Sequence, residues 1–403
     1  MHNAGDMRGL RRLTFALLWV TLFVIPWENV AKFEGVGTIS RLAGIAAAGA
    51  GLLTVLVQGE VRRPGPFLWA AAAFAGWNAL TLFWTIDVGL SLQQIFTYAQ
   101  LLVLVWLMGE FAASVVAVRA LMLAYVLGAA VSAASTVRNY TSGRETTYLR
   151  YAAFNFDSND LGLILALGVP LAWYLLMEDG RRLVRWAAAA YLPLALVGVL
   201  LTASRGAFLA TVVAVSIVAW TFRRLGFRAR VLVGALAVLT GAGVLTMVPA
   251  TSWRRLSTIR TEVGAGTMNQ RTEIWEAGAD VFPESPLLGV GSAAFRTAVE
   301  TRLGIPQAAH NAFLGVLVDA GIVGLALFCT MLAVAMALIR RFPPLERTVW
   351  LVVGATWLVG VMSLSWEYRK PTWVMFGLLA AHAAALGRAP RPDRAAEFAG
   401  ERA

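Results

Sequence analysis

Two arginines and one histidine carry the side-chain chemistry that stands out in this sequence. Arg205 lies in the tight turn 202–206 between two apolar runs, and Arg271 opens a polar segment further along. A guanidinium matches a phosphate with two parallel hydrogen bonds, and a helix N-terminus beside it adds a favourable dipole. His310 stands at the start of another apolar run, where the helix dipole favours a neutral ring able to accept a proton. These residue types predict an anion-binding site beside a general base.

Each of these residues also has a plainer interpretation. Arg205 can reach outward to lipid headgroups along its apolar stem. Arg271 and Trp275 are four residues apart and share one side of an amphipathic helix, which requires no ligand. An isolated histidine is more often structural than catalytic. Further arginines are expected on the same side of the membrane, among them Arg150, Arg255 and Arg296. They can equally be interpreted as solvated loop charges.

Several other residues could support such a site: Asn155, Asn159, Ser204, Trp275 and Asn311. Asp319 lies inside the apolar run that follows His310, about 13 Å further along a helix at 1.5 Å per residue. A carboxylate at membrane depth is a functional candidate by default. For Asp319 a packing or relay role is favoured over direct chemistry.

The sequence predicts no metal site and no cofactor. It has one cysteine, Cys329, and three scattered histidines. An Asp-x-Asp motif, a nucleotide-binding loop and a Gly-x-Ser-x-Gly motif are all missing from it. This argues against a nucleotide-sugar enzyme that uses Mg²⁺ and against a serine hydrolase.

The elements that must position these residues are membrane helices. Of the 403 residues, 59% are hydrophobic and 14% are charged, well below the charged fraction of a soluble domain. A span needs about 20 mostly apolar residues. We therefore predict an all-α polytopic membrane protein of about twelve transmembrane helices, at 13–30, 39–58, 66–86, 93–112, 117–135, 160–177, 184–203, 205–222, 229–249, 311–339, 347–366 and 372–388.

Most lysines and arginines fall in one alternate set of connections between these spans, which predicts that this set and both termini are cytoplasmic. Residues 1–388 then form one integral-membrane domain. Residues 250–310 form a long periplasmic loop with an amphipathic helix over 267–281 and a short helix near 293–303. Residues 389–403, rich in arginine, proline and alanine, are expected to be a disordered cytoplasmic tail.

Four motifs, in order, resemble those of the O-antigen ligase family, within the larger group of membrane O-antigen ligases, polymerases and protein oligosaccharyltransferases. They are Phe154-Asn155-Phe156-Asp157-Ser158-Asn159-Asp160-Leu161, Thr202-Ala203-Ser204-Arg205-Gly206-Ala207, Arg271-Thr272-Glu273-Ile274-Trp275 with Ser285-Pro286-Leu287-Leu288-Gly289-Val290-Gly291, and His310-Asn311-Ala312-Phe313-Leu314 with Asp319-Ala320-Gly321. The resemblance covers residues 150–325. The family often has glutamate where Asp319 stands.

The resemblance implies a metal-independent glycosyl transfer at the periplasmic face of a bacterial inner membrane. The donor would be a polysaccharide (O-antigen) on undecaprenyl diphosphate, the acceptor a sugar hydroxyl of lipid A–core, and no nucleic acid would take part. Arg205 and Arg271 are then candidates for the diphosphate, and His310 for the general base. An O-antigen polymerase, whose acceptor is a second lipid-linked glycan, and a protein O-oligosaccharyltransferase remain alternatives. A secondary transporter fits the topology, but it should show repeated halves and midplane charges.

Overall fold

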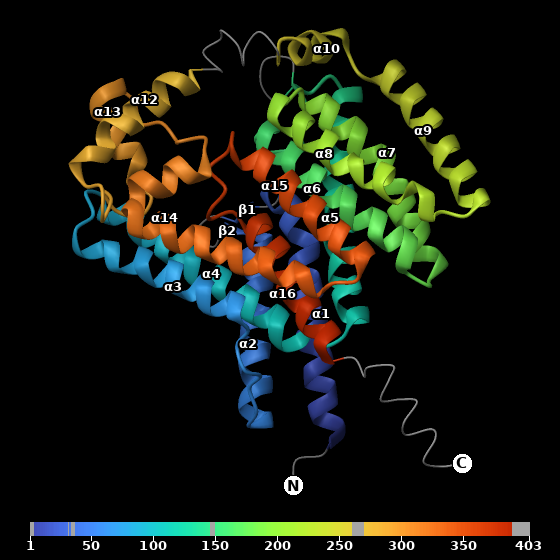
Figure 1. Cartoon of the computed structure of the whole chain (residues 1–403), viewed down its shortest axis with the longest axis horizontal. Coiled ribbons are helices and arrows are strands. Elements are labelled where there is room, and N and C mark those ends of the chain that lie inside the picture. The colour runs from blue at the N-terminus through green and yellow to red at the C-terminus, as the bar shows by residue number, and fades with distance from the viewer. Residues whose placement is uncertain (1–3, 31, 34–36, 146–149, 260–269, 389–403) are drawn as a thin grey trace.

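The computed structural model describes residues 4–30, 32–33, 37–145, 150–259 and 270–388 (Figure 1). The predicted tail 389–403 and residues 260–269 of the predicted loop lie outside this described part. Within it, the chain is a bundle of helices, with a smaller group of helices at one end.

Ten helices of the described part are long and apolar enough to cross a membrane, some of them continuing into a short 3₁₀ turn. They are α1 (Ala4–Val24), α2 (Ile39–Gln58), α3 (Pro66–Leu80), α4 (Val88–Phe111), α5 (Val115–Thr141), α6 (Ser158–Glu178), α7 (Arg182–Thr202), α8 (Arg205–Thr221), α9 (Phe227–Met247) and α14 (Ala312–Leu338). Two further helices, α15 (Pro344–Val361) and α16 (Lys370–Arg388), occupy the places of the last two predicted spans. The prediction of an all-α polytopic membrane fold is confirmed.

The remaining elements are short. The 3₁₀ turns are η1 (Ile25–Val30), η2 (Thr81–Phe83), η3 (Phe222–Arg224), η4 (Phe282–Glu284) and η5 (Ile339–Arg341), and the segment 250–310 holds α10 (Ala250–Ser257), α12 (Arg271–Val281) and α13 (Phe295–Leu303). Strands β1 (Lys32–Phe33) and β2 (Gly37–Thr38) pair antiparallel between α1 and α2. The sequence predicted helices near α12 and α13, but neither α10 nor the strand pair.

Helix α6 is the centre of the bundle. In its 18-residue apolar stretch 83% of the residues are buried, and the helix packs against α5, α7, α8 and α15. Gly162 lets α6 approach the start of α8, because a side chain at this position would collide with Ala207. In contrast, no residue in the 18-residue apolar stretch of α9 is buried, and this helix lies along α7 at the outer edge of the bundle (Figure 1). The centre of the protein is therefore at α6, next to the turn that carries Arg205.

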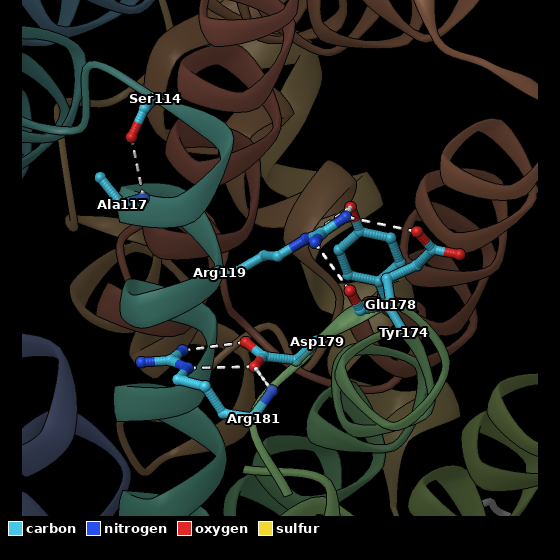
Figure 2. Close-up of polar contacts among 7 residues, drawn as sticks. All are labelled: Ser114, Ala117, Arg119, Tyr174, Glu178, Asp179 and Arg181. Atoms are coloured by element: carbon cyan, nitrogen blue, oxygen red, sulfur yellow. Dashed lines mark hydrogen bonds and ion pairs between the residues drawn. The ribbon is translucent and has the colours of Figure 1, made fainter.

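A polar cluster ties α5 to α6 at the end where α5 begins and α6 finishes (Figure 2). The Arg119 guanidinium donates to the Glu178 carbonyl at 2.8 Å and stacks over the Tyr174 ring, 5.2 Å from its centroid. Nearby, Asp179 pairs with Arg181 at 2.9 Å. With 21 residues, α6 is about 31 Å long, so this cluster is at the other end of the bundle from Ser158 and the Arg205 turn.

Helix α14 is interrupted at Gly321, whose φ of 69° and ψ of −172° are not helical. The segment 286–291 runs beside the break and pairs with the backbone groups that the break leaves without helical partners. The bonds run from Ile322 N–H to the Pro286 carbonyl (2.9 Å), from Val290 N–H to the Val318 carbonyl (3.0 Å) and from Gly291 N–H to the Asp319 carbonyl (2.9 Å). The Trp77 indole donates to the Ala320 carbonyl at 2.9 Å. Through these bonds the segment 286–291, which lies between α12 and α13, is attached to α14 at its interruption.

Candidate functional site

The N-termini of α6, α8, α12 and α14 carry the predicted site residues. Burial and then the charge of Arg205 lower the pKa of Arg271, while Asp157 at the start of α6 raises it. Burial and then the charge of Arg271 lower the pKa of His310. Charges act on each other in this way only at short range, so Arg205, Arg271 and His310 belong to one cluster. Four helix N-termini add partial positive charge to it, which suits an anionic ligand.

Arg150 is a member of this cluster that sequence reasoning did not single out. Its Nε donates to the Thr202 carbonyl and its guanidinium also donates to Asn159 Oδ1, both at 2.8 Å. Arg150 is only 8% exposed. Burial first, and the charge of Arg255 next, lower its pKa to about 10. Arg150 therefore holds the chain just before the Arg205 turn and adds a further positive charge behind it.

The turn that carries Arg205 is strained and tightly held. Ala203 has a φ of 48°, a left-handed conformation that costs a residue other than glycine roughly 1–2 kcal/mol. The Ser204 side chain caps α8 by accepting from Ala207 N–H at 3.3 Å, and Tyr151 N–H donates to the Leu201 carbonyl at 3.1 Å. With Ser204 as the cap, Arg205 is the first residue of α8. Its guanidinium therefore extends from a fixed helix N-terminus.

His310 is also fixed by its backbone. Its φ is 47°, and its N–H donates to Ser365 Oγ at 3.0 Å. Asn311 caps α14 by accepting from the N–H groups of Phe313 (3.0 Å) and Leu314 (3.1 Å). The Trp275 indole donates to the Ala309 carbonyl at 2.9 Å, which ties α12 to the residue before His310. The lowered pKa of His310 keeps the imidazole neutral. From the sequence we expected a neutral ring because of the helix dipole, whereas burial is the first cause.

The asparagines predicted to support the site, Asn155 and Asn159, help to fix the chain around it. Asn159 accepts from Arg150, as described above, and Asn155 occupies a left-handed position with a φ of 60°, which asparagine tolerates. Asp157 caps α6 by accepting from the N–H groups of Asn159 (2.8 Å) and Asp160 (3.1 Å). The segment before α6 is thus built as a support for Arg150 and, through it, for the Arg205 turn.

Asp319 contacts the loop rather than the arginine cluster. Its carboxylate accepts from Phe295 N–H at 2.6 Å and from Ala293 N–H at 3.1 Å, at the start of α13. These bonds, with those around the break in α14, hold the segment 286–295 in place. These are structural contacts, and the packing or relay role of Asp319 stays a prediction. Among the described residues, no group of three or more His, Cys, Asp or Glu side chains is placed to hold a metal ion.

The fold and this site define a multi-pass membrane protein with a buried cationic cluster and a neutral histidine at one end of the bundle. Residues 190–329 match the family model described as O-antigen ligase, and the matched range includes Arg205, Arg271, His310 and Asp319. This part of the chain is therefore similar to the O-antigen ligase family, whose members are membrane glycosyltransferases that act on lipid-linked glycans. No curated protein sequence matches it.

Proposed function

We propose that this protein is an O-antigen ligase of the bacterial inner membrane. It transfers a polysaccharide from undecaprenyl diphosphate to a sugar hydroxyl of lipid A–core, at the periplasmic face. The observation that carries the proposal is the convergence of Arg205, Arg271 and His310 in one partly buried cluster. A diphosphate leaving group and a hydroxyl nucleophile require these two kinds of group next to each other.

The arginines would bind the donor diphosphate. When the bond between the anomeric carbon and the diphosphate oxygen breaks, negative charge develops on that oxygen. Fixed positive groups in a water-poor site stabilise such charge strongly, because they need no reorganisation during the reaction. Arg205 on α8 and Arg271 on α12 come from two separate elements and can contact the two phosphates from two directions. Arg150 holds the Arg205 turn in place through its hydrogen bond to the Thr202 carbonyl.

His310 would activate the acceptor. The imidazole takes the proton of the acceptor hydroxyl as its oxygen forms the new bond to the anomeric carbon. The electron pair of the breaking bond leaves with undecaprenyl diphosphate. A positioned general base contributes typically about 10²–10⁴-fold, and a neutral ring with a lowered pKa is ready to act at neutral pH. The fixed backbone of His310 holds the ring at the boundary between α14 and the loop.

The experiment that tests the ligase reaction deletes the gene and follows both lipids. A ligase mutant should accumulate lipid A–core without polysaccharide, while polymer of normal length persists on undecaprenyl diphosphate. A polymerase mutant should instead lack long polymer on the carrier and still cap lipid A–core with a single repeat unit. Unchanged lipopolysaccharide in the deletion strain would refute both assignments. Purified protein in nanodiscs, supplied with both lipids and no metal, gives the same test in vitro.

A further inference from the structure

A cavity lies next to residues that flank or contact the His310 backbone. It has a volume of about 350 Å³, and residues of α4, α13, α14 and the 365–370 turn line it. Ser365, which accepts from His310 N–H, and Ala309 are part of its wall. Arg150, Arg205 and Arg271 are not. The cavity therefore adjoins the His310 backbone, but the three arginines do not line it.

This cavity is polar and contains a buried group that lacks a partner. Glu367 is 5% exposed, and among the described residues its Oε2 has no hydrogen-bond partner. Arg296 lines the same cavity, and its charge is a smaller cause of the lowered pKa of His310, after burial and the charge of Arg271. Of the ion pairs among described residues, none includes Arg296. An unpartnered carboxyl group and a cation without an acidic partner mark a place built for a polar ligand.

An apolar groove continues from this cavity between the helices. Residues of α1, α2 and α4 line it, and its volume is about 250 Å³. Thr97 and Lys370 belong to both the groove and the cavity. Arg41, at the start of α2, lies at the same end as Lys370, and the opposite part is lined by aliphatic residues such as Ala48 and Leu104. Together the two spaces suit an amphiphilic ligand, because the cavity near the His310 backbone is lined by charged residues and the groove between the helices is mostly apolar.

We propose that the groove and the cavity bind the lipid acceptor, with its acyl chains between α2 and α4 and its phosphorylated saccharide head beside Arg296 and Glu367. This inference rests on the proposed ligase function and names the route of its second substrate. A phosphorylated acyl glycolipid fits better than the polyprenyl donor for two reasons. The proposed diphosphate ligands do not line this cavity. The cations Arg41, Arg296 and Lys370, the last of which pairs with Glu28, are spread over the two spaces, as separate phosphates on a saccharide head would require.

Photo-crosslinking tests where the acyl chains lie. A benzoylphenylalanine replaces Ile45, which lines the groove, or, as a control, Leu56, an exposed residue of the same helix outside the groove. The protein is placed in nanodiscs with radiolabelled lipid A–core. We expect crosslinking at position 45 to exceed that at position 56 by about tenfold or more, and excess unlabelled lipid A–core to remove it. Equal crosslinking at the two positions, or crosslinking at 45 only by labelled undecaprenyl diphosphate, would overturn the proposal.

Matched substitutions test the route in transfer assays. Ala48→Trp fills the groove, whereas Ala46→Trp adds the same bulk to an exposed position of α2 outside it. Arg296→Gln removes one cation of the cavity, whereas Arg302→Gln changes an arginine of the same helix that pairs with Glu284. We expect Ala48→Trp and Arg296→Gln to raise the KM for lipid A–core by about tenfold, equivalent to about 1.4 kcal/mol, without changing the donor KM. The controls should match the wild type.

The two proposals fail in different ways. If wild-type protein transfers glycan but Ala48→Trp and Arg296→Gln leave the acceptor KM unchanged, only the acceptor route is wrong. If wild-type protein transfers nothing to lipid A–core but position 45 still crosslinks it specifically, the groove binds the lipid and the ligase function is wrong.

Discussion

Arg271 and Arg205 repel each other from two different helices, since after burial the charge of Arg205 is the next cause of the lowered pKa of Arg271. Two like charges held close together cost free energy in the empty protein. An anion between them removes this cost and gains both attractions. We therefore propose that the two arginines act together in binding an anion, although 65 residues of chain separate their positions.

Replacing either arginine should abolish most transfer. Arg205→Ala and Arg271→Ala should each lower the rate by about a hundredfold or more, the usual effect of removing one charge-stabilising donor. Arg205→Lys should recover part of the rate, because a lysine keeps the charge but loses the paired hydrogen bonds. The measurement is transfer to lipid A–core at equal protein levels, with Arg302→Ala as a control on α13. Either alanine variant with full activity would remove that arginine from the mechanism.

Replacing His310 should separate binding from turnover. His310→Ala should bind the donor nearly as the wild type does, while turnover falls by about 10²–10⁴-fold. His310→Gln can still form a hydrogen bond but cannot take the proton, so it should be as inactive as the alanine variant. Donor affinity and single-turnover rates measure the two effects. A glutamine variant close to the wild-type rate would show that His310 only positions the acceptor.

The pH dependence should follow the charges around His310. Burial and Arg271 lower its pKa, so the wild-type rate should fall with acid only below the ordinary range of histidine. Asp157 raises this pKa, so Asp157→Asn should move the acid limb to still lower pH. Asparagine caps a helix about as well as aspartate, which keeps α6 intact. The profile of Asp280→Asn, an exposed change on α12, should not move. An acid limb displaced upward in Asp157→Asn would contradict the assignment of that limb to His310.

Replacing Asp319 should destabilise the segment 286–295 and should not act directly on the chemical step. Asp319→Ala leaves the N–H groups of Ala293 and Phe295 without their acceptor, and each buried unpaired group costs about 1–3 kcal/mol. We expect a lower unfolding temperature in detergent and faster tryptic cleavage at Arg296. Asp319→Asn keeps one acceptor oxygen and should be intermediate. Wild-type stability in Asp319→Ala, together with lost turnover, would instead indicate a direct catalytic part.

Labelling of introduced cysteines tests the orientation of the chain. In a Cys329→Ser background, Glu300→Cys on α13 should react with a membrane-impermeant maleimide in intact cells. Arg341→Cys, at the end of η5, should react only after the membrane is opened. The expectation follows from the distribution of lysine and arginine. The reverse pattern would place His310 on the cytoplasmic side.

Much of the fold could be predicted because its signals are local. Runs of apolar residues fix the helices, Ser204 and Arg205 mark the turn between α7 and α8, and Ile274 and Ala277 mark the buried side of α12. Arg205 and His310 stand out in the sequence, since ionisable groups beside a membrane span are rare and costly. These signals need no knowledge of which helices are neighbours.

The rest depends on contacts between distant parts of the chain. Arg150 is one loop arginine among many until its bond to Thr202 is known. Glu367 gives no sequence signal of its own, because only the packing around the 365–370 turn buries it. The interruption of α14 at Gly321 is hidden inside an apolar run that is long enough for an unbroken helix. The bond of Trp275 to Ala309 likewise joins residues that the sequence did not connect.

The break in α14 also has a consequence for biosynthesis. The segment 286–295 leaves the ribosome before residues 318–323, yet these later residues supply several of the partners of its backbone. Helices α12 and α13 therefore have no complete docking surface until the following span has been made and inserted. A fragment of the loop expressed without α14 should be unfolded, so antibodies raised against such a fragment should recognise the denatured protein and not the native one.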